Sequence, residues 1–316
     1  GAPVQILTLS NERAEAESII RHLTSRIDEG IYKYKDFAVL YRTNAQSRSI
    51  EEAFIRYNIP YHIVGGVRFY DRKEIKDIIA YLRLIYQPED RVSLERIINI
   101  PARGIGPKSL LGVLSYANQL GSIDKALNTI DLCPGLTPKA KAQVADLADT
   151  LNSLRKIIET SSLSGLIDSL IRRIQYLKYL DDGTLQGEAR VENVKELISV
   201  ALEYQELGLG VFLEEVALIS DVDNANFDNN TVTLMTLHAA KGLEFDVVFM
   251  IGMEEGLFPH SRALYDASEM EEERRLCYVG MTRARRELIL TNANSRMIYG
   301  SVSHNIPSRF LSEIDG

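Results

Sequence analysis

The chain has 316 residues, with 44 acidic and 36 basic side chains and a formal net charge of −8. This length suggests about two domains and is ample for a buried core. No apolar run approaches the roughly 18 residues of a membrane-spanning helix, the five histidines have no metal-ligand spacing, and Cys133 and Cys277 lie far apart. We therefore expect a soluble protein with free thiols and no metal site.

The first 70 residues alternate between strand-like and helix-like segments. The expected strands are Gln5–Leu9, Phe37–Arg42 and Tyr61–Val64, and the expected helices are Ala14–Ile27 and Ser49–Tyr57. Such alternation predicts a parallel sheet with right-handed crossovers.

After about residue 70 the pattern becomes almost wholly helical, and strands return only at Thr231. The expected helices are Lys73–Tyr86, Ser93–Ile100, Lys108–Gln119, Lys139–Glu159, Leu163–Ile174, Val191–Gln205 and Phe212–Ile219. The simplest fold is an α/β parallel-sheet domain interrupted by a mostly α-helical inserted domain. The sheet domain is expected to comprise residues 1–69 and 223–316, and the insertion residues 70–222.

The insertion contains a glycine-rich turn between two apolar helices. Gly104, Ile105 and Gly106 there resemble a helix-hairpin-helix element. The glycines let the backbone approach a phosphate closely, while Arg103 and Lys108 add positive charge. We expect contact with a DNA backbone, duplex rather than single-stranded; an ordinary turn between helices is the alternative.

Two regions near the C-terminus are the most informative. Between Thr233 and Phe249, two strand-like runs flank a loop that holds His238, Lys241, Gly242 and Glu244. Between Glu273 and Arg286, the run ERRLCYVGMTRARR places two pairs of arginines on an expected helix that ends beside the strand-like segment Glu287–Thr291. The planar guanidinium suits phosphate recognition, although a solvated charged face would have a similar composition.

Together these regions resemble motifs five and six of the PcrA, UvrD and Rep group of superfamily 1 DNA helicases, in which TLHAAKGLEF and YVG-hydrophobic-TRA are signature strings. The resemblance extends to YRTNAQSRSIEEAF from Tyr41, IVGGVRFYDRKEIKD from Ile63 and GMEEGLFPH from Gly252. It covers nearly the whole chain in order. It implies a second RecA-like domain, termed 2A, with its inserted domain 2B.

The phosphate loop G-x-x-x-x-G-K-[ST] is missing from the sequence. The chain therefore resembles only the second half of such a helicase, and its start at Gly1 without a methionine suggests an excised piece. The resemblance implies that the complete protein uses ATP and Mg²⁺, held mainly by the missing N-terminal RecA-like half. We expect the isolated chain to bind no cofactor tightly and to be inactive as an ATP hydrolase.

The resemblance also assigns nucleotide-site roles. Arg283 matches the arginine finger that reaches the γ-phosphate across the cleft, and Glu244 matches the residue that accepts hydrogen bonds from the nucleotide ribose. Gly242 permits close approach. For Glu244, a carboxylate that stabilises a helix N-terminus is the structural alternative.

For single-stranded DNA, Arg42 and Asn44 match the family's contacts just past a strand end, where ligands bind in parallel sheets. Thr236 and His238 match residues that couple nucleotide state to the DNA strand. Tyr299 matches an aromatic that stacks on a base. The alternatives are a half-buried core role for Tyr299 and a helix-capping role for Arg42.

The net negative charge does not exclude DNA binding, because contacts can be local. Between Arg283 and Tyr299, four arginines (Arg283, Arg285, Arg286 and Arg296) face only Glu287, which suggests a basic track whose binding weakens with salt. Arg72 and Lys73 are further candidate DNA contacts.

We thus expect the C-terminal half of an ATP-dependent 3′–5′ DNA helicase of the repair and replication type. Its partners would be single-stranded DNA, single/double-strand junctions, the missing half, and repair or transcription proteins, with no membrane, in the bacterial cytoplasm at the nucleoid. The alternatives are a DNA-binding or protein-docking module without motor activity, or part of a helicase-nuclease subunit.

Overall fold

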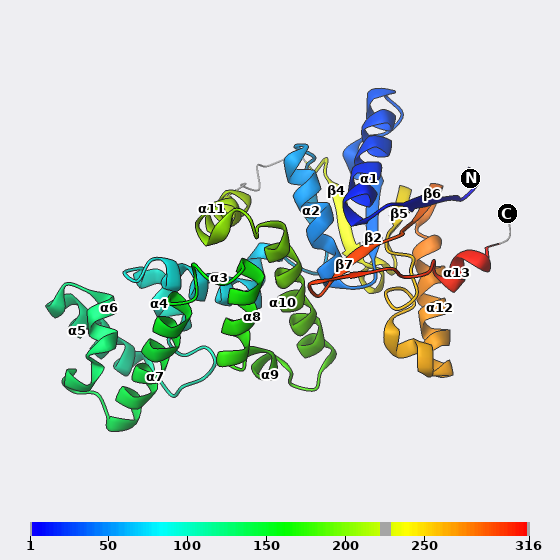
Figure 1. Cartoon of the computed structure of the whole chain (residues 1–316). Helices are drawn as coiled ribbons and strands as arrows, with labels where there is room; N and C mark the ends of the chain where they lie inside the picture. Colours follow the sequence, from blue (N-terminus) through cyan, green and yellow to red (C-terminus); the bar gives the residue numbers. More distant parts are fainter. Residues whose placement is uncertain (1, 222–228, 315–316) are drawn as a thin grey trace. The chain divides into compact units, whose positions relative to one another are not determined.

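Two units make up the computed structural model, which describes residues 2–221 and 229–314. One unit comprises Gly1–Phe69 and Ile219–Gly316, and the other comprises Tyr70–Leu218 (Figure 1). The domain boundary expected at residues 222 and 223 lies outside the described residues.

The first unit is built on a six-stranded sheet with the order β1-β6-β5-β2-β4-β3. All five neighbouring pairs are parallel. Its strands are β1 (Gln5–Leu9), β2 (Phe37–Tyr41), β3 (Tyr61–Ile63), β4 (Val232–Thr236), β5 (Phe245–Met250) and β6 (Ala284–Ala293). An antiparallel hairpin of β7 (Arg296–Ile298) and β8 (Ser301–Ser303) follows. The expected α/β class is confirmed.

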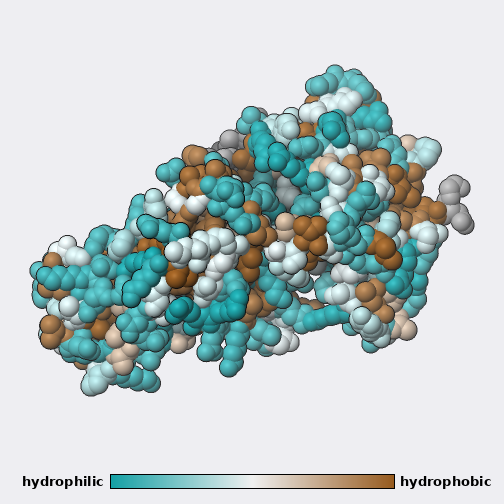
Figure 2. Space-filling model, viewed as in Figure 1, coloured by the Kyte–Doolittle hydropathy of each residue, from teal (hydrophilic) through white to brown (hydrophobic). Residues whose placement is uncertain are grey.

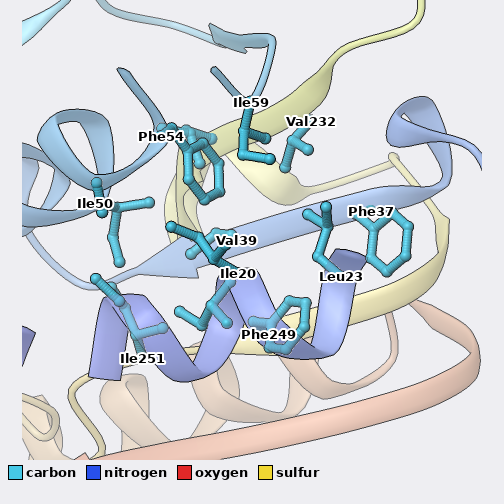
Figure 3. Packing of buried hydrophobic residues seen from close by; sticks show 14 of the residues in the cluster. Ile20, Leu23, Phe37, Val39, Ile50, Phe54, Ile59, Val232, Phe249 and Ile251 are labelled. Carbon is cyan, nitrogen blue, oxygen red and sulfur yellow. The ribbon is translucent and has the colours of Figure 1, made fainter. Parts of the chain in front are cut away.

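Helices cover both faces of this sheet. Its α-helices are α1 (Glu12–Asp28), α2 (Ser47–Arg56), α12 (Ala267–Met281) and α13 (Arg309–Ser312), and its 3₁₀ turns are η1 (Tyr34–Asp36), η2 (Asn44–Gln46), η5 (Leu237–Ala240) and η6 (Ser261–Tyr265). Because successive strand residues point to opposite faces, β2 contributes Phe37 and Val39 to one core cluster and Leu40 to the other. Figure 3 shows the first cluster, in which Ile20 and Leu23 of α1 and Phe54 of α2 pack on the sheet.

The second unit is helical. It contains α3 (Lys73–Tyr86), α4 (Arg91–Ile97), α5 (Pro107–Leu120), α6 (Ile123–Asn128), α7 (Pro138–Arg155), α8 (Leu163–Arg173), α9 (Tyr176–Leu180), α10 (Leu185–Glu203) and most of α11 (Gly208–Asp221), with the turn η4 (Ile130–Leu132); η3 (Phe69–Asp71) lies at the border of the two units. Side chains that favour helix starts explain several boundaries, since Thr137, Ser162 and Thr184 each accept a bond from a first-turn amide.

The expected helices of this unit are present, but short ones escape the sequence pattern. Helices α6 and α9 have six and five residues, which is too short for a clear 3.6-residue period. Helix α10 begins at Leu185 rather than Val191, because the Thr184 cap fixes its start.

The arginine-rich run is divided differently from the expectation. Helix α12 ends at Met281 and β6 already begins at Ala284, so Arg285 and Arg286 lie in a strand and not on the helix. The physical reason is pairing with β5, since Ala284 is registered against Phe245 and the Phe245 amide donates to the Arg283 carbonyl.

No helix among the described residues is long and apolar enough to span a membrane. Hydrophilic and hydrophobic residues are interspersed on the face shown in Figure 2.

Gly280 lets α12 lie close to β5 and η5. A Cβ at this position would overlap Cδ2 of buried Leu237 and lie 3.0 Å from Cε of Met250. Alanine normally favours a helix by up to about 1 kcal/mol over glycine. Overpacking a core costs about 1–3 kcal/mol, so Gly280→Ala should reduce the free energy of unfolding despite its helix propensity.

Urea denaturation of the chain measures this change. Tyr278→Ala, at a 69% exposed position of the same helix, is the control and should change stability by less than about 0.5 kcal/mol. A Gly280→Ala variant as stable as the parent would contradict the close packing.

Candidate nucleotide and nucleic-acid sites

The parallel sheet brings four of the expected residues to its carboxyl edge. Tyr41 at the end of β2 is registered against Thr236 at the end of β4. Arg42 and Asn44 follow the first strand, and His238 lies in η5 after the second. Residues from two distant sequence motifs therefore lie at neighbouring strand ends.

Arg42 is held by a forked ion pair. Its Nε lies 3.0 Å from both carboxylate oxygens of Glu273 in α12, and its Nη2 lies 2.7 Å from Glu273 Oε1. Glu273 Oε2 also accepts the His260 amide at 2.9 Å. Two parallel N–H donors to one carboxylate fix a guanidinium plane, so Arg42 has a defined orientation at this edge.

The backbone after β2 is also constrained. Gln46 Oε1 accepts the amides of Arg42 and Thr43, both at 2.9 Å. Gly252, after β5, has a φ of +67°, and a Cβ there would collide with Gln46 Nε2. The strings YRTNAQ and GMEEGLFPH therefore meet at the carboxyl edge, which explains why the second needs a glycine.

The pKa of the His238 ring is lowered by some neighbouring groups and raised by others. Partial burial lowers the pKa of its imidazole from 6.5, the Arg42 charge lowers the pKa further, and Glu273 and Glu272 oppose this shift. The ring retains access to solvent. It is therefore mainly neutral at pH 7 and can both donate and accept a hydrogen bond.

Gly242, Glu244 and Arg283 lie at the opposite, amino edge of the sheet. Glu244 directly precedes β5, and Arg283 directly precedes β6. Gly242 has a φ of +85° with open space around its would-be Cβ, so the backbone conformation and not crowding requires glycine. The expected nucleotide residues thus share one edge.

Arg283 is oriented by neutral groups. Its Nε donates to the Val279 carbonyl at 2.9 Å, its Nη1 to the Leu243 carbonyl at 3.0 Å, and its Nη2 to Thr282 Oγ1 at 3.1 Å. Among the described residues no carboxylate pairs with Arg283. Its full positive charge is consequently available to an anion.

The neighbouring arginines differ from Arg283. Arg285 Nε lies 3.1 Å from Glu244 Oε2, and Arg286 Nε lies 3.7 Å from Asp246 Oδ1. The side chains of Arg285 and Arg286 are 58% and 66% exposed, so each pair contributes little to stability. Glu244 would have to share its carboxylate with Arg285 when it accepts from a ligand.

Helix α12 connects the two edges. Its 15 residues extend about 22 Å, from the half that holds Glu273 and hence Arg42 to the C-terminal end that precedes Arg283. A displacement of this helix would therefore move groups at both edges.

Tyr299 lies at the turn of the β7–β8 hairpin and not simply after the last strand. It has a φ of +52°, is 43% exposed, and is followed by Gly300 at +80°. Two successive residues with positive φ are typical of a tight hairpin turn. The turn therefore presents a partly exposed aromatic ring.

The expected basic track must be corrected at Arg296. This residue is only 7% exposed, and its Nη2 lies 2.7 Å from both Glu15 Oε2 and Glu254 Oε1. Two buried carboxylates surround the guanidinium, so Arg296 does not contact DNA. Removing one partner from such a buried ion pair costs about 3–5 kcal/mol.

The glycine-rich turn of the helical unit begins α5. Gly104 has a φ of +74°, Gly106 is the N-cap, and a Cβ on either would meet open space. The first intrahelical bond runs from Leu110 to Gly106, so the Lys108 and Ser109 amides lie at the exposed helix start. Lys108 is exposed, and no ion pair involves it among the described residues.

Arg103 has mainly a structural role in this turn. Its Nη1 donates to the carbonyls of Ile97, Ile98, Ile100 and Pro101, and its Nη2 lies 2.6 Å from the Tyr81 hydroxyl. The guanidinium therefore holds the turn in shape, and Lys108 is the better placed cation. Arg72 is similarly occupied, since it is buried and donates to Asn193 Oδ1 at 2.8 Å, whereas Lys73 is exposed.

Neither a metal site nor a reactive cysteine is found in the part of the chain that the structure describes. No group of three or more His, Cys, Asp or Glu side chains there could hold a metal ion. Both cysteines are free and buried, and burial raises the pKa of the Cys277 thiol to about 12. Neither thiol is a ready nucleophile.

Sequence reasoning missed the residues that orient the site, namely Glu15, Gln46, Glu254 and Glu273. Gln46, Glu254 and Glu273 lie inside the recognised strings YRTNAQ, GMEEGLFPH and ERRLCYVGMTRARR, which was an available signal. Glu273 and Glu15 contact residues 231 and 281 positions away, and no local pattern indicates such pairing.

Comparisons with known proteins agree with these strings. The family described as UvrD-like helicase C-terminal domain matches residues 1–295. ATP-dependent DNA helicase PcrA of Staphylococcus aureus (strain Mu50) is 45% identical over 325 aligned residues, which cover 99% of this chain and 44% of that protein. The PcrA helicase of Staphylococcus epidermidis (strain ATCC 35984) is 44% identical with the same coverage. The chain thus spans less than half the length of these relatives.

The environment of His238 leads to a pH prediction. NMR titration should give an imidazole pKa below 6.5, so that the ring is half protonated only at a pH below 6.5. Arg42→Gln should raise this pKa, because it removes a repelling charge and leaves Glu273 unpaired nearby. Arg13→Gln removes an exposed pair on α1 and should leave the His238 titration unchanged. A lower pKa in Arg42→Gln would contradict the arrangement.

Proposed function

The chain belongs to the family of UvrD-like helicase C-terminal domains, and on that premise we propose that it forms one half of an ATP-dependent 3′–5′ DNA helicase. Residues 1–69 and 223–316 would be the second RecA-like domain (2A), and residues 70–222 the inserted domain (2B). The observation that carries the proposal is the separation of two residue sets on one sheet. Candidate DNA contacts lie at the carboxyl edge and candidate nucleotide contacts at the amino edge.

At the amino edge, Arg283 would act as the arginine finger. Support comes from its orientation by three oxygen acceptors and from the absence of a carboxylate partner among the described residues. A preoriented, unneutralised guanidinium can stabilise charge that develops on a transferred phosphoryl group. Glu244 would accept from the ribose hydroxyls, and the open space at Gly242 would admit the nucleotide.

ATP, bound with Mg²⁺ mainly by the N-terminal RecA-like half, would supply the phosphoryl group whose transfer to water drives the motor. The residues described here fit a contact with the triphosphate, because Arg283 is cationic and Gly242 leaves room. Because the chain lacks the phosphate loop G-x-x-x-x-G-K-[ST], we propose that it does not hydrolyse ATP on its own.

At the carboxyl edge, Arg42 and Asn44 would bind the single strand, and Thr236 and His238 would couple that contact to η5. Tyr299 would stack on a base, which contributes about 1–3 kcal/mol without sequence preference. Helix α12, which connects Glu273 to Arg283, would link the two edges.

In the helical unit, the first turn of α5 would contact a duplex backbone at a single/double-strand junction. Gly104 and Gly106 would allow close approach, Lys108 would provide charge, and Arg103 would keep the turn in shape. Other partners would be repair or transcription proteins in the bacterial cytoplasm at the nucleoid.

A docking module without motor activity is the second candidate. It would explain the helical unit but not an unneutralised Arg283 oriented by three neutral acceptors. A helicase-nuclease subunit is the third candidate, and the strings YRTNAQSR, FYDRKEIKD and MEEGLFPH favour the PcrA, UvrD and Rep group over it.

Arg283 gives the decisive test. In the complete helicase, Arg283→Ala should reduce DNA-stimulated ATP turnover by about a thousandfold or more, while nucleotide binding weakens but remains measurable. Arg275→Ala, at an exposed position of α12 paired with Glu272, is the matched control and should retain turnover. Unchanged turnover in Arg283→Ala would exclude the finger role.

The duplex contact has a separate test. Lys108→Ala should weaken binding to a duplex-tailed oligonucleotide and lower the slope of log affinity against log salt by about one, with little change for single strands. Lys139→Ala, at another exposed lysine near a helix start, should have no such effect. Equal losses on both substrates would argue against a duplex contact.

A further inference from the structure

The β7–β8 hairpin that carries Tyr299 is too small to hold its own orientation. Each strand has three residues, and among the strands that the structure describes the two pair only with each other. An isolated two-stranded hairpin is marginal in water. Something else must fix where the aromatic ring lies.

The Met297 amide of β7 donates to Glu12 Oε1 at 3.0 Å, and Arg296, the first residue of β7, provides the buried attachment. Its Nε lies 3.1 Å from Glu254 Oε2 and its Nη2 lies 2.7 Å from Glu254 Oε1, so that one carboxylate accepts a fork. The same Nη2 lies 2.7 Å from Glu15 Oε2. The Arg296 side chain is 8% exposed and both carboxylates are 1% exposed. Solvent therefore competes little for these bonds.

Both glutamates are themselves fixed to the carboxyl edge of the sheet. Glu254 Oε1 accepts the Ala293 amide at 2.8 Å, at the end of β6. Glu15 Oε1 accepts the Gly252 amide at 3.0 Å and the Thr291 hydroxyl at 2.5 Å. The hairpin is thus tied through Arg296 to the ends of β5 and β6.

We propose that Arg296, Glu254 and Glu15 form a buried positioning clamp for Tyr299. They do not touch DNA but fix the hairpin, so that the ring is held at the edge where Arg42 also lies. The inference rests on the proposed stacking of Tyr299 on single-stranded DNA. Glu254 belongs to the string GMEEGLFPH, so this string would help to position Tyr299.

The neighbouring residue supplies a natural control. Glu255 belongs to the same string but pairs with Arg309, whose side chain is 45% exposed, at 2.7 Å. That pair connects to α13 and not to the hairpin. Glu255→Gln therefore removes a comparable forked carboxylate next to the clamp without affecting the attachment of Tyr299.

A double-mutant cycle tests the clamp. In the complete helicase, the Kd for fluorescein-labelled oligothymidylate is measured for Glu254→Gln, Tyr299→Ala and the double variant, with circular dichroism to verify folding. Tyr299→Ala should weaken binding roughly tenfold, the scale of one lost base stack. Glu254→Gln should weaken binding similarly, and the double variant should be no weaker than Tyr299→Ala alone, because both changes remove one contact. Glu255→Gln should bind normally.

The failures are distinguishable. If Tyr299→Ala binds normally, the stacking role is wrong and the inference is overturned with it. If Tyr299→Ala weakens binding but Glu254→Gln does not, or if the two losses add, the stacking role survives and only the clamp is overturned. Should Glu254→Gln fail to fold, Arg296→Lys replaces it in the same cycle, since lysine keeps the charge but lacks the planar fork.

Discussion

Parallel pairing of all six strands is the constraint on which the candidate sites depend. In a parallel sheet all strands begin at one edge and end at the other. Residues that follow a strand therefore lie at the opposite edge from residues that precede a strand. Arg42 and His238 follow β2 and β4, whereas Glu244 and Arg283 precede β5 and β6. The proposed contacts with single-stranded DNA and with the nucleotide are thereby separated by the length of a strand, and any coupling between the two sets must pass through the body of the domain.

Helix α12 is the element suited to that coupling. Glu273 in its N-terminal half holds Arg42 in a forked pair, while Val279 in its last turn accepts from Arg283. Gly280 lets the helix lie directly on β5 and η5. A closely packed helix moves as a unit and not residue by residue, so each end is sensitive to the position of the other.

The sequence was sufficient for the α/β class, for the helical insertion and for the family resemblance, because these depend on periodicity and on contiguous strings. It was insufficient where long-range pairing decides. Arg296 looks like part of a basic track until Glu15, far away in sequence, is placed beside it. Arg285 and Arg286 look helical until β6 pairs with β5. From its place in the sequence Arg103 is a candidate DNA contact, but in the structure its guanidinium donates to carbonyls of its own turn. The charge of a sequence segment does not reveal whether an arginine side chain already forms hydrogen bonds or ion pairs within the protein.

The insertion has a topological consequence. Strands β3 and β4 are hydrogen-bonded neighbours, yet residues 64–231 lie between them in the chain, where a parallel pair needs only a crossover of a dozen or so residues. The helical unit is therefore one greatly enlarged crossover whose removal would leave the strand order intact. The length and the surface of this crossover can therefore change without altering the strand order or either edge of the sheet.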